Sequence, residues 1–149
     1  MFEPGTIALV GVGFAILGPI IAAAFTIITC GTAIAGVGIK KPGLLSRLII
    51  TVVLGEALAI YGLLIAFMLI SKLPLVTSVD AANKCLMAGI IIAVACVSAA
   101  AGIGYSGSSL ASATLEREET FSSNVIAVVL SEALAIYGLL ISFMIIGQI

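Results

Sequence analysis

The sequence Val52-Val-Leu-Gly-Glu-Ala-Leu-Ala-Ile-Tyr-Gly-Leu-Leu-Ile-Ala-Phe-Met68 returns in the second half of the chain, from Val128 to Met144, with 15 of its 17 positions unchanged. The copies differ only at two pairs of positions, Gly55/Ser131 and Ala66/Ser142. Each copy carries one charged residue, Glu56 or Glu132, inside an otherwise uncharged apolar run. The repeat therefore predicts two equivalent halves, each of which places an acid in apolar surroundings.

The composition is that of an integral membrane protein. Of 149 residues, 62% are hydrophobic and 9% are charged, whereas about a quarter of the residues of a soluble domain are charged. A membrane-spanning helix needs about 20 apolar residues. Four runs meet this requirement: Thr6–Ile39, Leu48–Ile70, Cys85–Tyr105 with an open continuation to Thr114, and Val125–Ile146. We predict an all-α protein of four transmembrane helices in two tandem hairpins, residues 1–73 and 77–149.

The first and third spans are rich in small residues at steps of three and four. The rows are Gly11, Ala15, Gly18, Ala22, Thr26, Thr29, Ala33 and Gly36, and Gly89, Ala93, Cys96, Ala100, Gly104, Gly107, Ala111 and Thr114. Such steps place residues on one helix face, and small faces let two backbones approach closely in lipid. We predict tightly packed inner helices. The alternative is chance, because Ala and Gly are abundant and the rows are two residues out of phase under the repeat.

The basic residues are unevenly distributed between the two sides. Lys40, Lys41, Arg47 and Arg117 lie in the first and third connections, whereas Lys72 and Lys84 lie on the other side. The positive-inside rule then places the first and third loops in the cytoplasm and both termini in the lumen or outside.

Several site chemistries are not supported by the composition. There is no His, and no basic run that would indicate a nucleic-acid partner. Cys30, Cys85 and Cys96 are odd in number and lie in or beside apolar runs, so we interpret them as packing residues and assign no disulfide, metal site or cofactor.

The two glutamates are the candidate functional residues. An acid in mid-membrane costs roughly 2.5–3.5 kcal/mol on insertion scales. We interpret Glu56 and Glu132 as carboxyls that bind a cation reversibly and keep a proton while they face lipid; the alternative is a hydrogen-bonded acid that joins helices. The spans contain no basic partner, so the ionised form needs a charge or a water path from another chain.

Three further residues are candidate supporting residues: Tyr61, Tyr137 and Ser131. Each tyrosine follows its acid by five residues. Ordinary helix packing is the role that we favour for both tyrosines, and the alternative is a hydroxyl that hydrogen-bonds near the acid.

These features resemble the proteolipid of V-type (vacuolar) rotary ATPases over nearly the whole chain. The motif Glu-Ala-Leu-Ala-Ile-Tyr-Gly in the even spans and the small-residue odd spans carry the resemblance. The first half, with Gly31-Thr-Ala-Ile-Ala-Gly36, Lys40-Lys-Pro42 and Glu56-Ala-Leu-Ala-Ile-Tyr-Gly62, is most similar to the c″ type.

The resemblance implies a ring of hairpins, with odd helices inside and even helices outside, in a vacuolar or other endomembrane. It implies protons carried on the outer glutamates past a stator subunit, whose arginine separates two half-channels. It also implies central-stalk subunits at the cytoplasmic loops. The chain would be a non-catalytic subunit, since no phosphate-binding Gly-rich loop is present. Duplicated proteolipids commonly keep a single acid, so whether one or both of Glu56 and Glu132 work is open.

Two other functions compete with the rotor. A small four-helix proton-coupled drug antiporter also uses an intramembrane glutamate, but it needs an aromatic cage for a lipophilic cation, and this chain has no Trp. A purely structural membrane protein leaves the duplicated acid unexplained. For the rotor, we expect H⁺ as the carried ion, because Na⁺ needs several oxygen ligands and few lie near either acid in the sequence.

Overall fold

A computed structural model describes residues 3–149, and these residues are almost entirely helical. The long helices are α1 (Pro4–Lys40), α3 (Ile50–Lys72), α4 (Val79–Glu116) and α5 (Phe121–Ile146). The short elements are η1 (Pro42–Leu44), α2 (Leu45–Leu48), η2 (Leu73–Leu75) and η3 (Glu118–Thr120). Met1 and Phe2, the start of the predicted first hairpin, lie outside the described residues.

The described chain contains four helical spans that are long and apolar enough to cross a membrane. They run over Pro4–Lys40, Pro42–Leu75, Val79–Glu116 and Glu118–Ile146. This confirms the predicted all-α class with four membrane-spanning helices. The starts of the second and fourth spans are separated by the same offset as Glu56 and Glu132, as the sequence repeat requires.

The third span is longer than its clearly apolar core. It begins at Val79, six residues before the expected Cys85, because Ser78 caps the helix by accepting a hydrogen bond from the Ala81 amide at 3.2 Å. It also continues through the polar Gly-Ser-Ser stretch to Glu116. Two hydroxyls there are satisfied within the helix: Ser106 Oγ donates to the Gly102 carbonyl at 2.6 Å and Ser108 Oγ to the Gly104 carbonyl at 2.9 Å.

Helix α1 continues through Pro19 as one element. A proline inside a helix leaves the carbonyl of the residue four positions earlier without its usual donor, and here that carbonyl belongs to Ala15. The free Ala15 carbonyl faces Gly62 of α3, whose missing side chain lets the two backbones come together. The proline is thus accommodated at the contact between α1 and α3.

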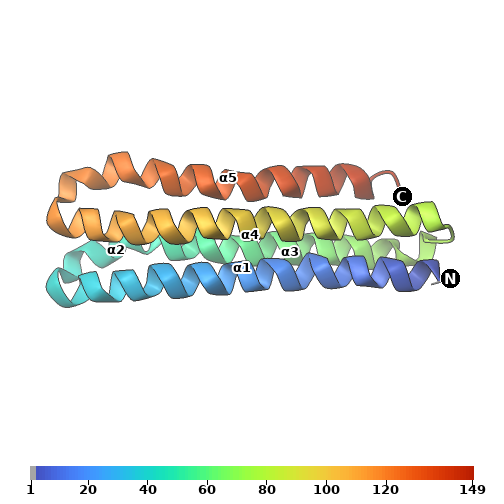
Figure 1. Ribbon diagram of the computed structural model, residues 1–149, viewed down its shortest axis with the longest axis horizontal. Coiled ribbons are helices and arrows are strands. Elements are labelled where there is room, and N and C mark those ends of the chain that lie inside the picture. The colour runs from blue at the N-terminus through green and yellow to red at the C-terminus, as the bar shows by residue number, and fades with distance from the viewer. Residues whose placement is uncertain (1–2) are drawn as a thin grey trace.

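The four long helices form two parallel copies of a helical hairpin. In Figure 1, α1 and α4 run in one direction, and α3 and α5 return in the other. Helices α1 and α4 make the most extensive contact, while α3 packs mainly on α1 and α5 mainly on α4. The first and third spans are therefore the inner pair, and α4 is the most buried of the four.

Most of the predicted small residues lie in the contact between the inner helices, but Gly36, the last of the α1 row, is exposed and has no atom near an added Cβ. A Cβ atom on Gly11 would lie 2.5 Å from the Cys85 carbonyl oxygen, and one on Gly89 would collide with the Gly11 carbonyl. Further along, Thr26 Oγ1 lies 3.5 Å from the Ala100 carbonyl, and Cys30 Sγ lies 3.6 Å from the Ile103 carbonyl. These contacts are the close backbone approaches that membrane helices use for association.

The phase difference between the two small-residue rows follows from this packing. Successive helical residues are turned by about 100°, so a shift of two residues turns a row by about 200° around the helix axis. The row on α1 therefore points to one side of its hairpin, and the row on α4 points to the other side. Two hairpins set side by side in the same orientation need this opposition.

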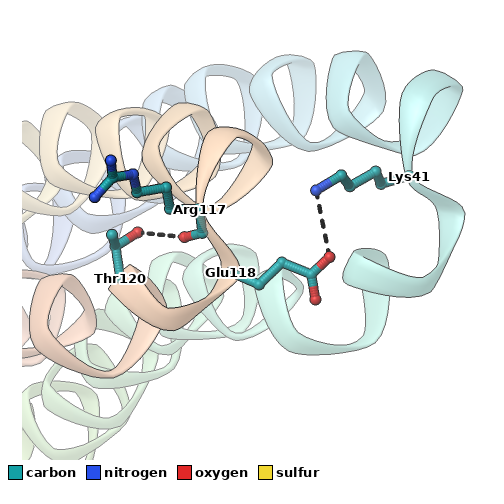
Figure 2. Close-up of polar contacts among 4 residues, drawn as sticks. All are labelled: Lys41, Arg117, Glu118 and Thr120. Carbon is teal, nitrogen blue, oxygen red and sulfur yellow. Dashed lines mark hydrogen bonds and ion pairs between the residues drawn. The ribbon is translucent and has the colours of Figure 1, made fainter.

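The two connections on one side of the bundle are joined by an exposed ion pair. The links between α1 and α3 and between α4 and α5 lie at the same end, opposite both termini (Figure 1). There Lys41 Nζ lies 3.3 Å from Glu118 Oε1, and the Thr120 hydroxyl donates to the Arg117 carbonyl at 2.8 Å (Figure 2). The Arg117 side chain points away from the ion pair.

Candidate functional site

Glu132 is held between the two outer helices. It lies in the middle of α5 and is only 8% exposed. The phenol hydroxyl of Tyr61, on α3, donates a hydrogen bond to Glu132 Oε1. The tyrosine thus supports the acid of the other hairpin, and not Glu56, which lies five residues before it on the same helix. Glu132 therefore has a polar partner at the contact between α3 and α5.

Glu56 occupies the matching place in the first hairpin, but its surroundings differ. Its side chain is exposed in the isolated chain, and within residues 3–149 it has no hydrogen bond or ion pair. Tyr137, the repeat equivalent of Tyr61, is 62% exposed and likewise has no hydrogen bond among the described residues. The structure therefore brings together Tyr61 and Glu132 and leaves Glu56 and Tyr137 apart.

Ser131 contributes to packing beside the acid. Its hydroxyl donates to the Ala127 carbonyl at 2.7 Å, one turn back in α5. On the other side it lies against Gly102 of α4, where an added Cβ atom would be 2.5 Å from Ser131 Oγ. As a candidate supporting residue, Ser131 acts at the contact between α4 and α5 and makes no hydrogen bond to Glu132.

The contacts inside the two hairpins repeat with the same offset as the sequence. An added Cβ atom on Gly62 would meet Pro19 and the Ala15 carbonyl, and one on Gly138 would meet Ala95 and, at 3.5 Å, the Ile91 carbonyl. Ala95 is the repeat equivalent of Pro19, and Ile91 is the repeat equivalent of Ala15. Each outer helix therefore sits on its inner helix in the same way.

The bilayer-spanning part of the described structure offers the acids no basic partner. The ion pairs found among residues 3–149 are Lys41–Glu118 at 3.3 Å and Lys84–Asp80 at 2.9 Å, and both lie near helix ends. No group of three or more His, Cys, Asp or Glu side chains in this part of the chain is arranged to hold a metal ion. Cys30, Cys85 and Cys96 are buried and free. The site consists of a carboxyl and a phenol in apolar surroundings.

The family model for the C subunit of ATP synthase matches the chain twice, at residues 10–69 and 86–145. The two matched segments have the offset of the sequence repeat, and together they cover most of the chain. The chain belongs to the ATP synthase C-subunit family.

Curated relatives narrow this assignment to the V-type proteolipids. The 16 kDa proteolipid of type c from the V-type proton ATPase of Ovis aries is 27% identical over 135 residues, which cover 91% of this chain and 87% of the relative. The c′ subunit of the V-type proton ATPase of Candida glabrata is 32% identical over 114 residues, covering 75% and 70%. The c′ subunit of Saccharomyces cerevisiae is 31% identical over the same length.

These matches confirm the resemblance to V-type ATPase proteolipids. Members of this family form rings, so a ring of proteolipids is the setting of this multi-pass membrane protein. The relatives named above are of the c and c′ types, and the likeness of the first half to the c″ type stays a prediction.

Sequence reasoning did not find the pairing of Tyr61 with Glu132. Each tyrosine is separated from the acid on its own helix by more than one turn, so the spacing along one helix predicts no direct contact. The partner instead comes from the other hairpin. The sequence repeat is the signal that could have indicated it. Because each repeat contains one tyrosine and one acid, the tyrosine of one repeat can pair with the acid of the other.

Proposed function

We propose that this chain is a rotor subunit of the membrane sector of a V-type ATPase, and that it carries H⁺ on Glu56 and Glu132. The observation that carries the proposal is the buried Glu132 carboxyl in the apolar helix α5, which has a phenol donor and no basic partner within the described spans. A buried carboxyl of this kind is stable in lipid only when it is protonated or paired. It is therefore suited to binding a proton and releasing it where another chain supplies a charge.

The chemistry of the cycle divides between this chain and a stator subunit. A protonated glutamate faces lipid while the ring turns, because the neutral form avoids the cost of a charge in the hydrocarbon. At the stator, an arginine stabilises the ionised form between two half-channels, one for proton entry and one for exit. The chain needs no phosphate-binding site for this role, and ATP hydrolysis belongs to other subunits.

The side-chain oxygens at Glu132 favour H⁺ over Na⁺ as the carried ion. The Tyr61 hydroxyl is the side-chain oxygen that contacts the carboxylate, and the nearby Ser131 hydroxyl is engaged by a backbone carbonyl. A dehydrated hard cation needs several oxygen ligands, whereas a proton needs one carboxyl oxygen. We also propose a vacuolar or other endomembrane location, with the Lys41 and Arg117 connections in the cytoplasm at the central stalk and both termini in the lumen.

The test is ATP-driven proton transport by rings that contain Glu132→Gln or Glu56→Gln. Each substitution keeps the size and removes the ionisable group, and if both acids work, each variant nearly stops transport because one dead site in every copy blocks the stator in every turn. The matched control is Glu3→Gln, which removes an exposed acid at the end of the bundle opposite these connections and leaves transport unchanged. Native mass measurements of the detergent-solubilised assembly show that the variants still form the ring.

Three outcomes would change the proposal. Full transport activity of one single variant would show that the substituted glutamate has a structural role and does not carry protons. Unaltered transport by both single variants and the double variant would remove the rotor-site assignment. A hydrophobic carbodiimide attacks protonated carboxyls. If millimolar Na⁺ protects the glutamates against this reagent, the carried ion is Na⁺ and not H⁺.

A further inference from the structure

The hydrogen bond from Tyr61 to Glu132 depends on the rotation and the height of α3. The two residues belong to different hairpins, so the phenol reaches the carboxyl only while α3 keeps its place among the other helices. A slip of one residue turns a helix by about 100° and moves it by about 1.5 Å, and a hydrogen bond weakens steeply when its angle is poor. The contacts that fix the turn around Tyr61 therefore decide whether Glu132 keeps its partner.

The turn of α3 that carries Tyr61 is fixed on two further sides. Gly62 lies against Pro19 of α1, where an added Cβ atom would collide with the proline ring. Leu58, three residues before Tyr61, is completely buried, and its carbonyl accepts a hydrogen bond from the Cys96 thiol of α4 at 3.7 Å. This one turn of α3 thus contacts α1, α4 and α5 through three separate groups.

Cys96 lies at the contact between the two hairpins. It is fully buried and free, and the carbonyl that accepts from it belongs to the other hairpin. Its repeat equivalent is Ile20, which has no side-chain donor and is 47% exposed. The α5 turn that corresponds to the fixed turn of α3 is exposed as well, at 45% for Leu134 and 62% for Tyr137. The thiol contact therefore occurs at the turn whose phenol holds an acid.

We propose that Cys96 is a positioning residue for the Glu132 site, because its thiol holds the turn of α3 that presents the Tyr61 hydroxyl to the carboxyl. The inference rests on the proposed rotor function and adds to its site a residue that acts through another helix. Loss of the thiol weakens the phenol bond while both of its partners stay in the chain. Glu56, which Tyr61 does not contact, is unaffected.

Carbodiimide labelling of the two glutamates in the assembled ring tests this inference. The reagent attacks protonated carboxyls, and a donor binds the ionised form more strongly, so a weaker phenol bond should raise the labelling rate of Glu132. Labelling is measured at a pH that suppresses most of it, so that a rise can be detected. Peptide mass spectrometry identifies the labelled residue, and Glu56 in the same sample is the internal standard.

The expected effects follow from the strength of each contact. Tyr61→Phe should raise the labelling rate of Glu132 by about fivefold, the factor that corresponds to one hydrogen bond of ordinary net strength. Cys96→Ala should raise it by about threefold, which corresponds to the average hydrogen bond between membrane helices. The labelling of Glu56 should stay the same in both variants.

A double variant distinguishes positioning from ordinary packing. If Cys96 acts through the phenol, Cys96→Ala should have no further effect on the labelling of Glu132 once Tyr61 has been replaced by Phe. A change that acts only through packing would have the same effect in both backgrounds, because independent effects add. Additive effects on the labelling of Glu132 would therefore overturn the inference.

The matched control is Cys85→Ala. Cys85 is an equally buried free cysteine on α4, about three turns before Cys96, and its carbonyl lies against Gly11 of α1. Both substitutions remove one sulfur atom from the same helix, so both should lower the unfolding temperature by similar amounts. Only Cys96→Ala should change the labelling of Glu132, and an equal change with Cys85→Ala would contradict the proposed role.

A second variant covers the case in which Cys96→Ala does not assemble. Cys96→Val keeps most of the volume and has no donor, so it should raise the labelling of Glu132 as Cys96→Ala does. Labelling at the wild-type rate in assembled Cys96→Val rings would show that the thiol does not hold the turn.

The inference and the proposed function fail in different ways. If Glu132→Gln stops transport but Cys96→Ala leaves the labelling of Glu132 unchanged, the inference is wrong and the rotor function stands. If the labelling responds to Cys96→Ala as expected but Glu132→Gln rings pump normally, the positioning role stands and the assignment of Glu132 as a proton carrier is wrong.

Discussion

Glu56 and Glu132 share almost the same local sequence but lie in different surroundings. Glu132 is nearly buried and bonded to Tyr61, whereas Glu56 is exposed and has no partner in the described chain. Their helices sit on the inner helices in the same way, so neither helix nor hairpin causes the difference. The neighbouring hairpin causes it: Glu132 lies on the flank of α5 that meets α3, whereas Glu56 is exposed on α3.

One contact between the inner and the outer helix is made in both hairpins, but the helix that carries the larger side chain differs. In the first hairpin Thr26 of α1 fills the space beside Gly55, where an added Cβ atom would be 2.5 Å from Thr26 Cγ2. In the second, Ser131 of α5 fills the space beside Gly102. The larger side chain is on the inner helix in the first hairpin and on the outer helix in the second. Filled volume is therefore the property that both hairpins share at this level.

The largest expected effect distinguishes the two close helix contacts. An Ala side chain at Gly62 would meet the Pro19 ring and the Ala15 backbone carbonyl, while one at Gly138 would collide with Ala95 alone. Overpacking costs about 1–3 kcal/mol, and we expect Gly62→Ala near the upper end and Gly138→Ala below it. Thermal unfolding of the detergent-solubilised protein is the measurement.

Two further variants control this comparison. Ala95→Gly should restore stability to Gly138→Ala, because it removes the single atom in the way. Gly36→Ala, in an open position of α1 with no atom within 4 Å of the added Cβ, should not destabilise the protein. Equal losses of stability in Gly62→Ala and Gly138→Ala would show that Pro19 does not make the first contact less tolerant of a larger side chain than the second.

An intermediate effect is expected from copying the second hairpin's side-chain pair into the first. Gly55→Ser alone places its side chain against Thr26, and Thr26→Gly alone leaves an unfilled space and a flexible helix position. The double variant reproduces the Gly102/Ser131 pair, so we expect it to be more stable than the sum of the single effects by about 0.5–3 kcal/mol, the range of coupling between residues in contact. Additive single effects would contradict the exchange of volumes.

Much of this fold could be predicted because the sequence is doubled. The lengths of the apolar runs predicted the four spans. The spacing of small residues at steps of three and four predicted the faces through which α1 and α4 pack. The third span was underestimated at its start, because hydropathy does not register the Ser78 cap. The small-residue rows of α1 and α4 differ in phase by two residues. This difference does not argue against packing of the two helices, because two hairpins in the same orientation require it.

The candidate site could be predicted only in part. The sequence identified both acids and both tyrosines, yet nearly identical stretches predict identical surroundings. The burial of Glu132 and the exposure of Glu56 depend on which acid faces the other hairpin, and no local pattern contains that information. For the same reason the local sequence does not show that the donor to Glu132 is Tyr61 on the other outer helix.

The smallest expected effect concerns an exposed ion pair between the hairpins that cannot repeat between chains. Lys41 pairs with Glu118 at 3.3 Å; the repeat equivalents are Arg117 and Pro42, so an Arg117 that meets the next copy finds no acid at this position. Lys41→Gln should therefore weaken only the junction inside the chain, by about 0.2–1 kcal/mol, as is usual for an exposed pair.

Pro42→Glu should have the opposite sign, because it offers Arg117 of the neighbouring copy an acid at the junction between chains. The side chains of Lys41 and Glu118 are about half exposed, at 41% and 51%, so salt should screen both effects. Thermal unfolding of the single chain tests the effect of Lys41→Gln, and the temperature at which the solubilised ring dissociates into single chains tests that of Pro42→Glu, each measured at low and at high salt. A rise with Pro42→Glu that disappears in high salt would place Arg117 at the junction between copies, and a salt-independent change would contradict that placement.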